Sequence, residues 1–407
     1  MTVIATHLNL LLLLLSAAPP GQSPDIPALE RAAAANATDV QTRQRLADAY
    51  LAAGRPMDAV THLRRAAQIA PRDPAVWYAL GQAYNSVKQD ALATFTSSSD
   101  EPWRQLLGAD ALLSTNHFAD AFALYQATLE RLPSMVSIHD SVADIYDRTG
   151  HPPWSVRERA KVRLTTADCA ARTALCEFRA RQFRAALAAA SGDDPESRYW
   201  RARAANELAL AAFKQLDVLP DSAERRSVRA TRAQAEERYI DAIAELKAAL
   251  KLAPDEPALM FALASAYYAA RDFDLAIATS APLLQANPND ARLLGLKGNS
   301  LLELRRPEEA VPILEQAVAR DPRNRGVRLA LGRAHLQSGN FSAAIALIEE
   351  QLPRDDDGSL HLQLSRAYAG LGQSDKARAL LARSDELQRA ARDRAARAAA
   401  RTITPPK

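Results

Sequence analysis

The chain has 407 residues, of which 48% are hydrophobic and 24% charged, and its formal net charge is +3. This length exceeds that of a typical domain, so we expect several domains or an extended repeat array, and the hydrophobic content excludes wholesale disorder. Aromatic residues make up only 6%, and Ala and Leu dominate the hydrophobic set, which favours close helix packing over a sheet-rich core. A net charge this small does not by itself indicate nucleic-acid binding.

The N-terminal sequence MTVIATHLNLLLLLLSAAPPGQS contains an apolar run from Leu8 to Leu15. The run has the length of a signal-peptide core and is too short to cross a bilayer. We therefore expect residues 1–23 to be a signal peptide and the mature chain to be exported, to the periplasm or the extracellular space. No Lys or Arg precedes the run, so an uncleaved apolar end on a cytoplasmic chain is the alternative. No other segment is long and apolar enough to cross a membrane.

The stretch PAVWYALGQAY carries Trp77, Leu80, Gly81 and Tyr84 at spacings that place them on one side of a helix. A glycine inside a helix costs about 1 kcal/mol relative to alanine. It therefore indicates that a neighbouring helix must come close at this position.

Similar stretches recur along the chain. YIDAIAELKAALKLAPDEP and PEEAVPILEQAVARDPRN place Ala, Leu, Ala and Pro at the same offsets, and Pro254, Pro288 and Pro322 are each 34 residues apart. This regular period predicts an array of similar structural units. The best frames begin near Val40, Pro74, Pro102, Val136, Ala223, Pro257, Ala291, Arg325 and Gly358.

The pattern resembles the tetratricopeptide repeat (TPR), a 34-residue helix-turn-helix unit with a W-x2-L-G-x2-Y, A-x3-F and P signature. The resemblance covers most of the mature chain, which is similar to exported bacterial proteins with many such repeats. It implies an all-α fold, a right-handed superhelical α-solenoid of stacked helix-turn-helix pairs with a long concave face. The small residues, Gly81 among them, are expected to lie where the first helix of a repeat meets the second. Glycines at the inter-helix turns are expected to end first helices in the left-handed conformation: Gly54, Gly150, Gly339 and Gly372.

The repeat pattern divides the mature chain into four parts. We expect an N-terminal array over 24–155, in which the frame from Pro74 is cut short at Pro102. One or two degenerate repeats without a clear inter-helix turn follow over 156–222. A C-terminal array occupies 223–388, and a basic capping helix and tail occupy 389–407.

Cys169 and Cys176 are the only cysteines. In an exported protein such a pair suggests a disulfide. In one unbroken helix the two residues would lie about 10.5 Å apart along the axis, beyond the roughly 7 Å Cα limit for a bridge. A disulfide therefore requires a break between them, and two buried thiols are the alternative.

Residues that would indicate catalysis, a metal site or a cofactor site do not form recognisable motifs. The seven histidines lack metal-ligand spacing, and His335 occupies the repeat position of Tyr84, which predicts core packing. The stretch RDDDGS resembles a calcium loop superficially, but it suits a turn with helix-capping side chains better. We therefore predict a non-enzymatic protein without cofactors. An enzyme with an unrecognised site in residues 156–222 is the alternative.

One helix position could line the concave face that the resemblance implies. It is occupied by polar residues that become basic toward the C-terminus, and arginine binds carboxylates with two parallel hydrogen bonds. We therefore expect a groove that binds a peptide or protein segment, including one with acidic groups; an ordinary polar helix surface is the alternative. The candidate residues are Thr231, Ser265, Asn299, Arg333 and Arg366, flanked by Phe261, Tyr268, Leu336 and Gln337.

The C-terminal sequence is rich in Ala and Arg, which predicts a helix. As a cap, this helix would cover the apolar edge of the last repeat. Alternatively, its arginines would contact an anionic polymer or a membrane surface, although nucleic acid is the less favoured ligand. The function that we predict is a non-catalytic scaffold for protein–protein interactions. The arginines of the tail are Arg389, Arg392, Arg394, Arg397 and Arg401.

Overall fold

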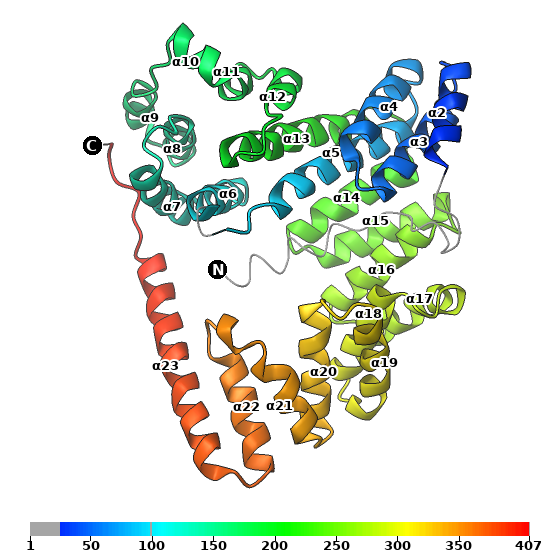
Figure 1. Cartoon of the computed structure of the whole chain (residues 1–407), viewed down its shortest axis with the longest axis vertical. Helices are drawn as coiled ribbons and strands as arrows, with labels where there is room; N and C mark the ends of the chain where they lie inside the picture. Colours follow the sequence, from blue (N-terminus) through cyan, green and yellow to red (C-terminus); the bar gives the residue numbers. More distant parts are fainter. Residues whose placement is uncertain (1–24, 98–99, 407) are drawn as a thin grey trace. The chain divides into compact units, whose positions relative to one another are not determined.

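The computed structural model describes residues 25–97 and 100–406, apart from the side chains of 398 and 399. The expected signal peptide, residues 1–23, therefore lies outside the described residues. The described part is all α-helical, without a strand, as predicted. It forms two compact units (Figure 1). The N-terminal unit contains the described residues up to Pro220 and those from Ala396 onward, and the C-terminal unit is Asp221–Ala395.

The N-terminal unit includes both the expected first array and the degenerate segment. Its helices are α2 (Ile26–Ala35), α3 (Val40–Ala52), α4 (Pro56–Ile69), α5 (Pro74–Ala93), α6 (Glu101–Ser114), α7 (Phe118–Arg131), α8 (Ser137–Arg148), α9 (Pro152–Arg159), α10 (Thr166–Ala171), α11 (Thr173–Arg179), α12 (Phe183–Ala189) and α13 (Pro195–Leu216).

The C-terminal unit is built from helices of similar length that follow one another in hairpins. Its helices are α14 (Ala223–Ala235), α15 (Tyr239–Leu252), α16 (Pro257–Ala269), α17 (Phe273–Ala286), α18 (Ala291–Glu303), α19 (Pro307–Arg320), α20 (Arg325–Gln337), α21 (Phe341–Glu349), the 3-10 helix η2 (Leu352–Arg354), α22 (Ser359–Gly370) and α23 (Ser374–Ala399). The last residues of α23, from Ala396, belong to the N-terminal unit.

The first helices of the hairpins start within one residue of the predicted frames, for example at Val40, Pro257 and Arg325. Capping explains several of these starts. The carboxylate of Asp290 accepts hydrogen bonds from the first backbone N–H groups of α18, and the side chain of Asn324 does the same for α20. In the RDDDGS stretch the cap residue of α22 is Gly358, and Asp357 and Asp355 accept hydrogen bonds from the N–H groups of Ser359 and His361 in the first turn. The predicted capping role of that stretch is confirmed.

Left-handed residues close the hairpins. The four glycines predicted for these turns all have φ between 69° and 82°, which confirms the prediction. In the C-terminal unit the N–H of the following residue donates to a carbonyl in the last turn of the first helix, as Asp272 does to Tyr267 at 2.8 Å. Arg181, with φ 61°, closes a hairpin of α11 and α12 inside the degenerate segment, a turn that the sequence did not reveal. The other non-glycine residues at such turns are Asn116, Glu237, Arg271 and Arg305.

In the C-terminal unit each helix packs against the next one along the chain, and successive first helices also touch. The small residues work as predicted. A Cβ atom at Gly298 of α18 would lie 2.5 Å from Leu314 of α19, its own hairpin partner. A Cβ atom at Gly332 of α20 would lie 3.0 Å from Ile348 of α21. Glycine therefore lets the two helices of these hairpins approach closely.

In the N-terminal unit the corresponding prediction for Gly81 is wrong in one respect. Helix α5 does not pair with the helix that follows it; its main partner is α13, which lies alongside it (Figure 1). A Cβ atom at Gly81 would lie 2.4 Å from the ring of Phe213 on α13. Leu80 and Tyr84 are buried in the same cluster as Ala205 of α13. Helices α6 to α12 are therefore inserted between the two helices of this pair.

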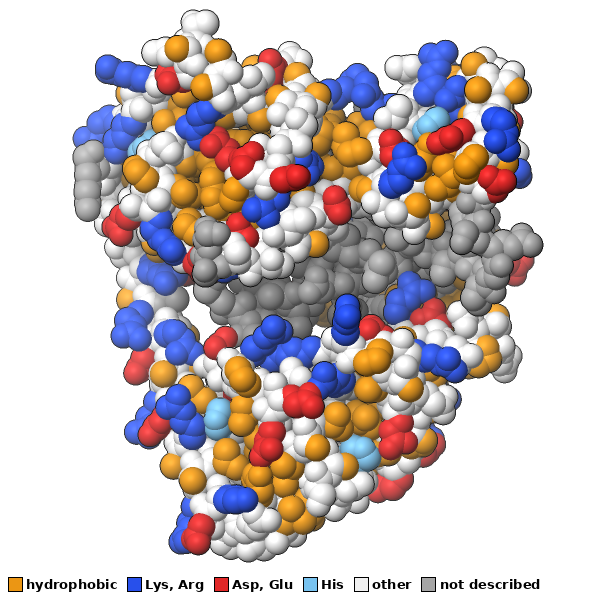
Figure 2. Space-filling model, viewed as in Figure 1, with side chains coloured by type: hydrophobic (Ala, Val, Ile, Leu, Met, Phe, Trp, Pro, Cys, Tyr) orange, Lys and Arg blue, Asp and Glu red, His pale blue; other side chains and the backbone are white. Residues whose placement is uncertain are grey.

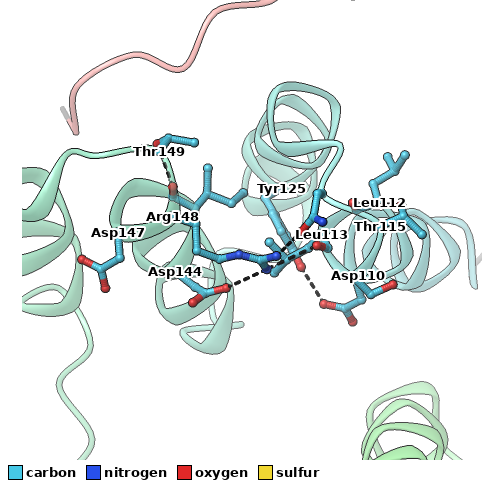
Figure 3. A network of polar contacts seen from close by, with 12 residues as sticks. Asp110, Leu112, Leu113, Thr115, Tyr125, Asp144, Asp147, Arg148 and Thr149 are labelled. Atoms are coloured by element: carbon cyan, nitrogen blue, oxygen red, sulfur yellow. Dashed lines mark hydrogen bonds and ion pairs between the residues drawn. The ribbon is translucent and has the colours of Figure 1, made fainter. Parts of the chain in front are cut away.

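A polar junction joins α13 to α6 and α7. Tyr125 and Tyr199 donate hydrogen bonds to the two carboxylate oxygens of Asp110 at 2.7 and 2.9 Å, and Arg203 donates to Asp110 at 2.9 Å. Burial, and then the negative charge of Asp110, raises the pKa of Tyr125 well above its ordinary value, so this phenol remains a donor. Figure 3 shows Tyr125 directed at Asp110, with Arg148 bonded to Asp144 beside them.

Cys169 and Cys176 form a disulfide, with their Cα atoms 5.5 Å apart. The helix breaks at Arg172, which ends α10 and precedes α11. This break is the condition that the sequence set for a bridge. Arg172 is itself held by an ion pair with Glu196 of α13 at 2.6 Å.

Candidate protein-interaction surfaces

The first helices α16, α18, α20 and α22 of the C-terminal unit form a continuous face, because each touches the next. We call this the first-helix face. Of the five residues predicted for the groove position, which we call the ladder residues, Ser265, Asn299 and Arg333 lie half-buried on this face and Arg366 is exposed on α22. The fifth, Thr231, is half-buried on α14. The amide of Asn299 donates to the carbonyl of Gly295 in its own helix at 2.8 Å, so this side chain is directed along α18.

Two charged side chains pair across this face, and a tyrosine from a third first helix lies within reach of their charges. Arg333 of α20 donates through Nη2 to Glu303 of α18 at 2.9 Å. Burial raises the pKa of Tyr268 on α16, and the negative charge of Glu303 raises it further, whereas Arg333 opposes this shift. Both charges therefore act on the tyrosine. We call Tyr268, Glu303 and Arg333 the face cluster.

Aromatic rings of α16 and α17 lie beside this cluster. The guanidinium of Arg292 lies 5.3 Å from the ring centre of Phe261, and the ring of Tyr268 meets Phe273 edge-on at 5.5 Å. Leu336 is half-buried against the core of the last repeats, and Gln337 is exposed. The structure thus brings Phe261 and Arg333 into contact with a neighbouring first helix, whereas Tyr268 contacts Phe273 of its own hairpin partner α17.

Glu303 and Arg292 were missed by the sequence reasoning. Both lie on α18: Glu303 is four residues after Asn299 and Arg292 is seven residues before it. Residues at these spacings share one face of a helix. Helix periodicity applied to the ladder position would have found both. What it would not have found is that Glu303 partners Arg333, because their contact crosses between two repeats.

A cleft of about 330 Å³ in the N-terminal unit lies between α8, α11, α12 and α13. Phe178 lies 5.2 Å from Phe183 and 5.1 Å from Trp200, measured between ring centres, and the guanidinium of Arg203 lies 4.9 Å from Phe178. On the face that Figure 2 shows, hydrophobic and acidic side chains gather over α8, α12 and α13. Rings rimmed by charges suit the binding of a protein segment, and this cleft falls partly in the segment 156–222.

The C-terminal unit has a second cleft, of about 390 Å³, between α14 and α15. Three arginines line it with Asp241 and Glu245. Arg238 pairs with Asp241 at 2.9 Å, and Arg226 beside the cleft pairs with Glu245 at 2.9 Å. The acidic side chains of this cleft are thus already engaged.

Helix α23 packs on the last repeat as a cap would. Ser384 is fully buried and donates to the carbonyl of Gly358 at 2.7 Å, and Arg394 donates to the carbonyl of Asp356 at 2.6 Å. Gly358 has φ 78°, and a Cβ atom there would lie 2.5 Å from the backbone of Ser384. Ser384 belongs to the last repeat itself, so among these contacts only that of Arg394 comes from the basic segment that was predicted to be a cap.

His335 is 7% exposed and packs in the C-terminal unit, in agreement with its predicted core position. His361 and His139 each bond a buried carboxylate, Asp355 and Glu158 respectively. Among residues 25–97 and 100–406 we find no group of three or more His, Cys, Asp or Glu side chains that could hold a metal ion. Within the same residues no helix combines the length and apolar character needed to span a membrane.

Comparison with known proteins supports the repeat assignment. Family models described as tetratricopeptide repeat match residues 40–83, 233–299 and 301–361. A search of curated proteins found no match.

Solved structures with similar folds include MamA residues 41-end from Desulfovibrio magneticus RS-1, at 20% identity and a TM-score of 0.39, covering 42% of this chain and 97% of that one. TTC0263, a thermophilic TPR protein of Thermus thermophilus, aligns at 21% identity and a TM-score of 0.35, covering 45% of this chain and all of its own. These values are too low to carry an argument about function.

Proposed function

From the premise that this chain is a tetratricopeptide-repeat protein, we propose that it is a non-catalytic scaffold whose first-helix face binds an extended peptide or protein segment. The observation that carries the proposal is the ion pair of the face cluster, in which Arg333 of α20 bonds Glu303 of α18, with Tyr268 of α16 influenced by both charges. Such a face presents side chains from several repeats to one ligand.

The chemistry of the cluster suggests how a segment would bind. Arginine has five N–H donors, and Arg333 uses Nη2 for Glu303, so further donors can reach a ligand carboxylate. The ion pair with Glu303 also holds the guanidinium in place, which reduces the entropy that binding would cost. Phe261 and Tyr268 supply apolar surface beside the charges, and exposed Arg366 extends the basic character onto α22. The proposed ligand is therefore an extended segment with acidic and apolar side chains.

The test is a binding measurement with peptides selected on the wild-type chain from a displayed random library. The double variant Arg333→Glu with Arg366→Glu should weaken binding of those peptides at least tenfold, because it reverses both charges. The matched control, Lys251→Glu with Arg323→Glu, makes the same change in net charge at two exposed positions near the ends of α15 and α19. Hydrogen exchange should show protection of α16, α18 and α20 on binding. Equal binding by both double variants would refute the assignment to this face.

We also infer that the mature chain is exported. The disulfide between Cys169 and Cys176 supports this inference, because disulfides persist mainly in oxidising compartments. Cell fractionation with mass spectrometry of the N-terminus tests it: we expect a chain that begins near residue 24 in the envelope or the medium. A full-length chain with reduced cysteines in the cytoplasm would contradict export.

A further inference from the structure

The residues that follow α23 lie on α7 and α8 of the N-terminal unit (Figure 1). Tyr146 of α8 donates a hydrogen bond to the backbone carbonyl of Thr404 at 2.7 Å. Arg401 pairs with Asp120 of α7 at 3.0 Å. Residues 401–406 have no regular secondary structure, so an extended segment is bound along two helices by one backbone contact and one side-chain contact.

An apolar side chain of the segment packs on the same surface. Ile403 packs against the core cluster that includes Phe122 and Tyr146, and Ile403 and Pro406 are half-buried while Thr402 and Pro405 are exposed. A spacing of three residues places side chains on one side of a polyproline II helix, a conformation that proline favours. The segment therefore presents one apolar edge to the unit and leaves its other residues in solvent.

The surface that receives the segment is aromatic. Tyr146 is fully buried, with its ring 5.8 Å from Phe122 and edge-on to Trp154 at 5.6 Å, and Trp154 stacks on His151 at 4.1 Å. Burial, with a contribution from the charge of Glu158, raises the pKa of Tyr146 to about 12. The phenol is thus a neutral donor at physiological pH. Aromatic surfaces of this kind bind proline-containing extended segments in other proteins.

We propose that Asp120, Phe122, Tyr146 and Trp154 form a second peptide-binding site, which we call the tail site. Its ligand is an extended segment with a basic residue two positions before an aliphatic one and prolines after it. Residues 401–406 of this chain occupy the site as an internal ligand, and a partner segment of the same chemistry must displace them. The tail site lies in the N-terminal unit, whereas the first-helix face belongs to the C-terminal unit, so this inference does not rest on the proposed function.

The energetics of these contacts set the expected affinity. Side chains of Arg401 and Asp120 are 45% and 36% exposed, so their ion pair contributes little. Burial of Ile403 and the hydrogen bond from Tyr146 carry most of the binding, which makes the site weak toward a separate peptide. A tethered segment experiences an effective concentration on the order of 1 mM. At an intrinsic Kd of about 0.1 mM, the internal ligand would weaken binding of a separate peptide roughly tenfold.

The experiment uses the full chain and a fluorescent peptide with the sequence of residues 400–407, ARTITPPK. Ile403→Asp in the chain should release the internal ligand, and the peptide should then bind roughly tenfold more tightly than to the wild-type chain. Thr402→Asp adds the same charge at an exposed neighbour and should behave as wild type. A peptide carrying Ile403→Asp should not bind either chain.

Substitutions in the site provide the second measurement. In the Ile403→Asp chain, Tyr146→Phe should weaken peptide binding roughly 2- to 10-fold, the loss expected for one hydrogen bond. Asp120→Lys should weaken binding slightly, and an Arg401→Asp peptide should recover the loss. Circular dichroism checks that each variant folds. Arg333→Glu with Arg366→Glu should leave peptide binding unchanged, which separates this site from the first-helix face.

Two results would overturn the proposal. One is equal binding of the peptide to the wild-type and Ile403→Asp chains. The other is no binding to a folded Ile403→Asp chain at millimolar peptide, which would reduce the tail contact to a structural one.

Discussion

Glycines at the same repeat position behave differently in the two units. In the C-terminal unit Gly298 and Gly332 receive Leu314 and Ile348 from the next helix along the chain. In the N-terminal unit Gly81 contacts Phe213 of a helix that begins more than 100 residues later. The pattern specifies that a helix must come close, but it does not specify which helix.

The different partner of Gly81 follows from the absence of an inter-helix turn in its frame. The C-terminal unit has a left-handed residue 14 positions into each frame, for example Arg305 and Gly339. The same position of the frame from Pro74 is Lys88, which lies inside α5, so this helix continues to Ala93 instead of turning back. Without a turn, the closing contact is made by α13, and the N-terminal unit depends on contacts between distant parts of the chain.

The substitution with the largest expected effect breaks those contacts between distant parts of the chain. Asp110→Asn removes the charge that Arg203, Tyr125 and Tyr199 share, and should lower the free energy of unfolding of the N-terminal unit by about 3 kcal/mol. Glu303→Gln removes the carboxylate that pairs with Arg333 and that is more exposed than Asp110. It should lower the free energy of unfolding of the C-terminal unit by less than about 1 kcal/mol. Denaturant unfolding followed by hydrogen exchange assigns each loss to its unit. Similar losses of stability from both variants would contradict the stronger dependence of the N-terminal unit on such contacts.

A second experiment tests the partner of Gly81. Gly81→Ala should destabilise the N-terminal unit by about 2 kcal/mol, because the added methyl group overlaps the ring of Phe213. Adding Phe213→Leu should recover part of the loss, with a coupling energy of about 1 kcal/mol in a double-mutant cycle. Gly298→Ala, tested with the same Phe213→Leu change, should show no coupling. Additive effects for Gly81 and Phe213 would show that α13 is not its partner in solution.

A third measurement concerns the disulfide, which closes a short loop in the N-terminal unit. Replacing Cys169 and Cys176 by Ser should lower the stability of this unit by about 2 kcal/mol, the value that loop-closure entropy gives for a loop of this length. The C-terminal unit should be unaffected, as thermal unfolding with and without reductant would show. A loss in the C-terminal unit would mean that the two units unfold together.

The substitutions with the smallest expected effect compare the left-handed turns of the two units. Arg181 and Arg305 both have φ 61°, a conformation that glycine adopts without strain. Arg305→Gly and Arg181→Gly should each stabilise their own unit by about 1 kcal/mol, measured from denaturant midpoints. Destabilisation by Arg181→Gly alone would show that the α11–α12 turn differs from the turns of the regular array.

Local regularities of the sequence determined much of this protein. The 34-residue period located the first helices, and the glycines at 54, 150, 339 and 372 located the left-handed turns, because both depend on backbone geometry within a few residues. The ladder position located the half-buried polar residues of the first-helix face, and the break needed between Cys169 and Cys176 was deduced from helix rise alone.

Only the tertiary structure decided which distant segments meet. The pairing of α5 with α13, the junction at Asp110, the partner of Arg333 and the contact of residues 401–406 with Tyr146 all join parts that carry no common periodicity. A helix with a small residue on one face accepts any helix with a complementary surface. The choice therefore depends on how the whole chain buries its apolar edges, which a local pattern does not encode.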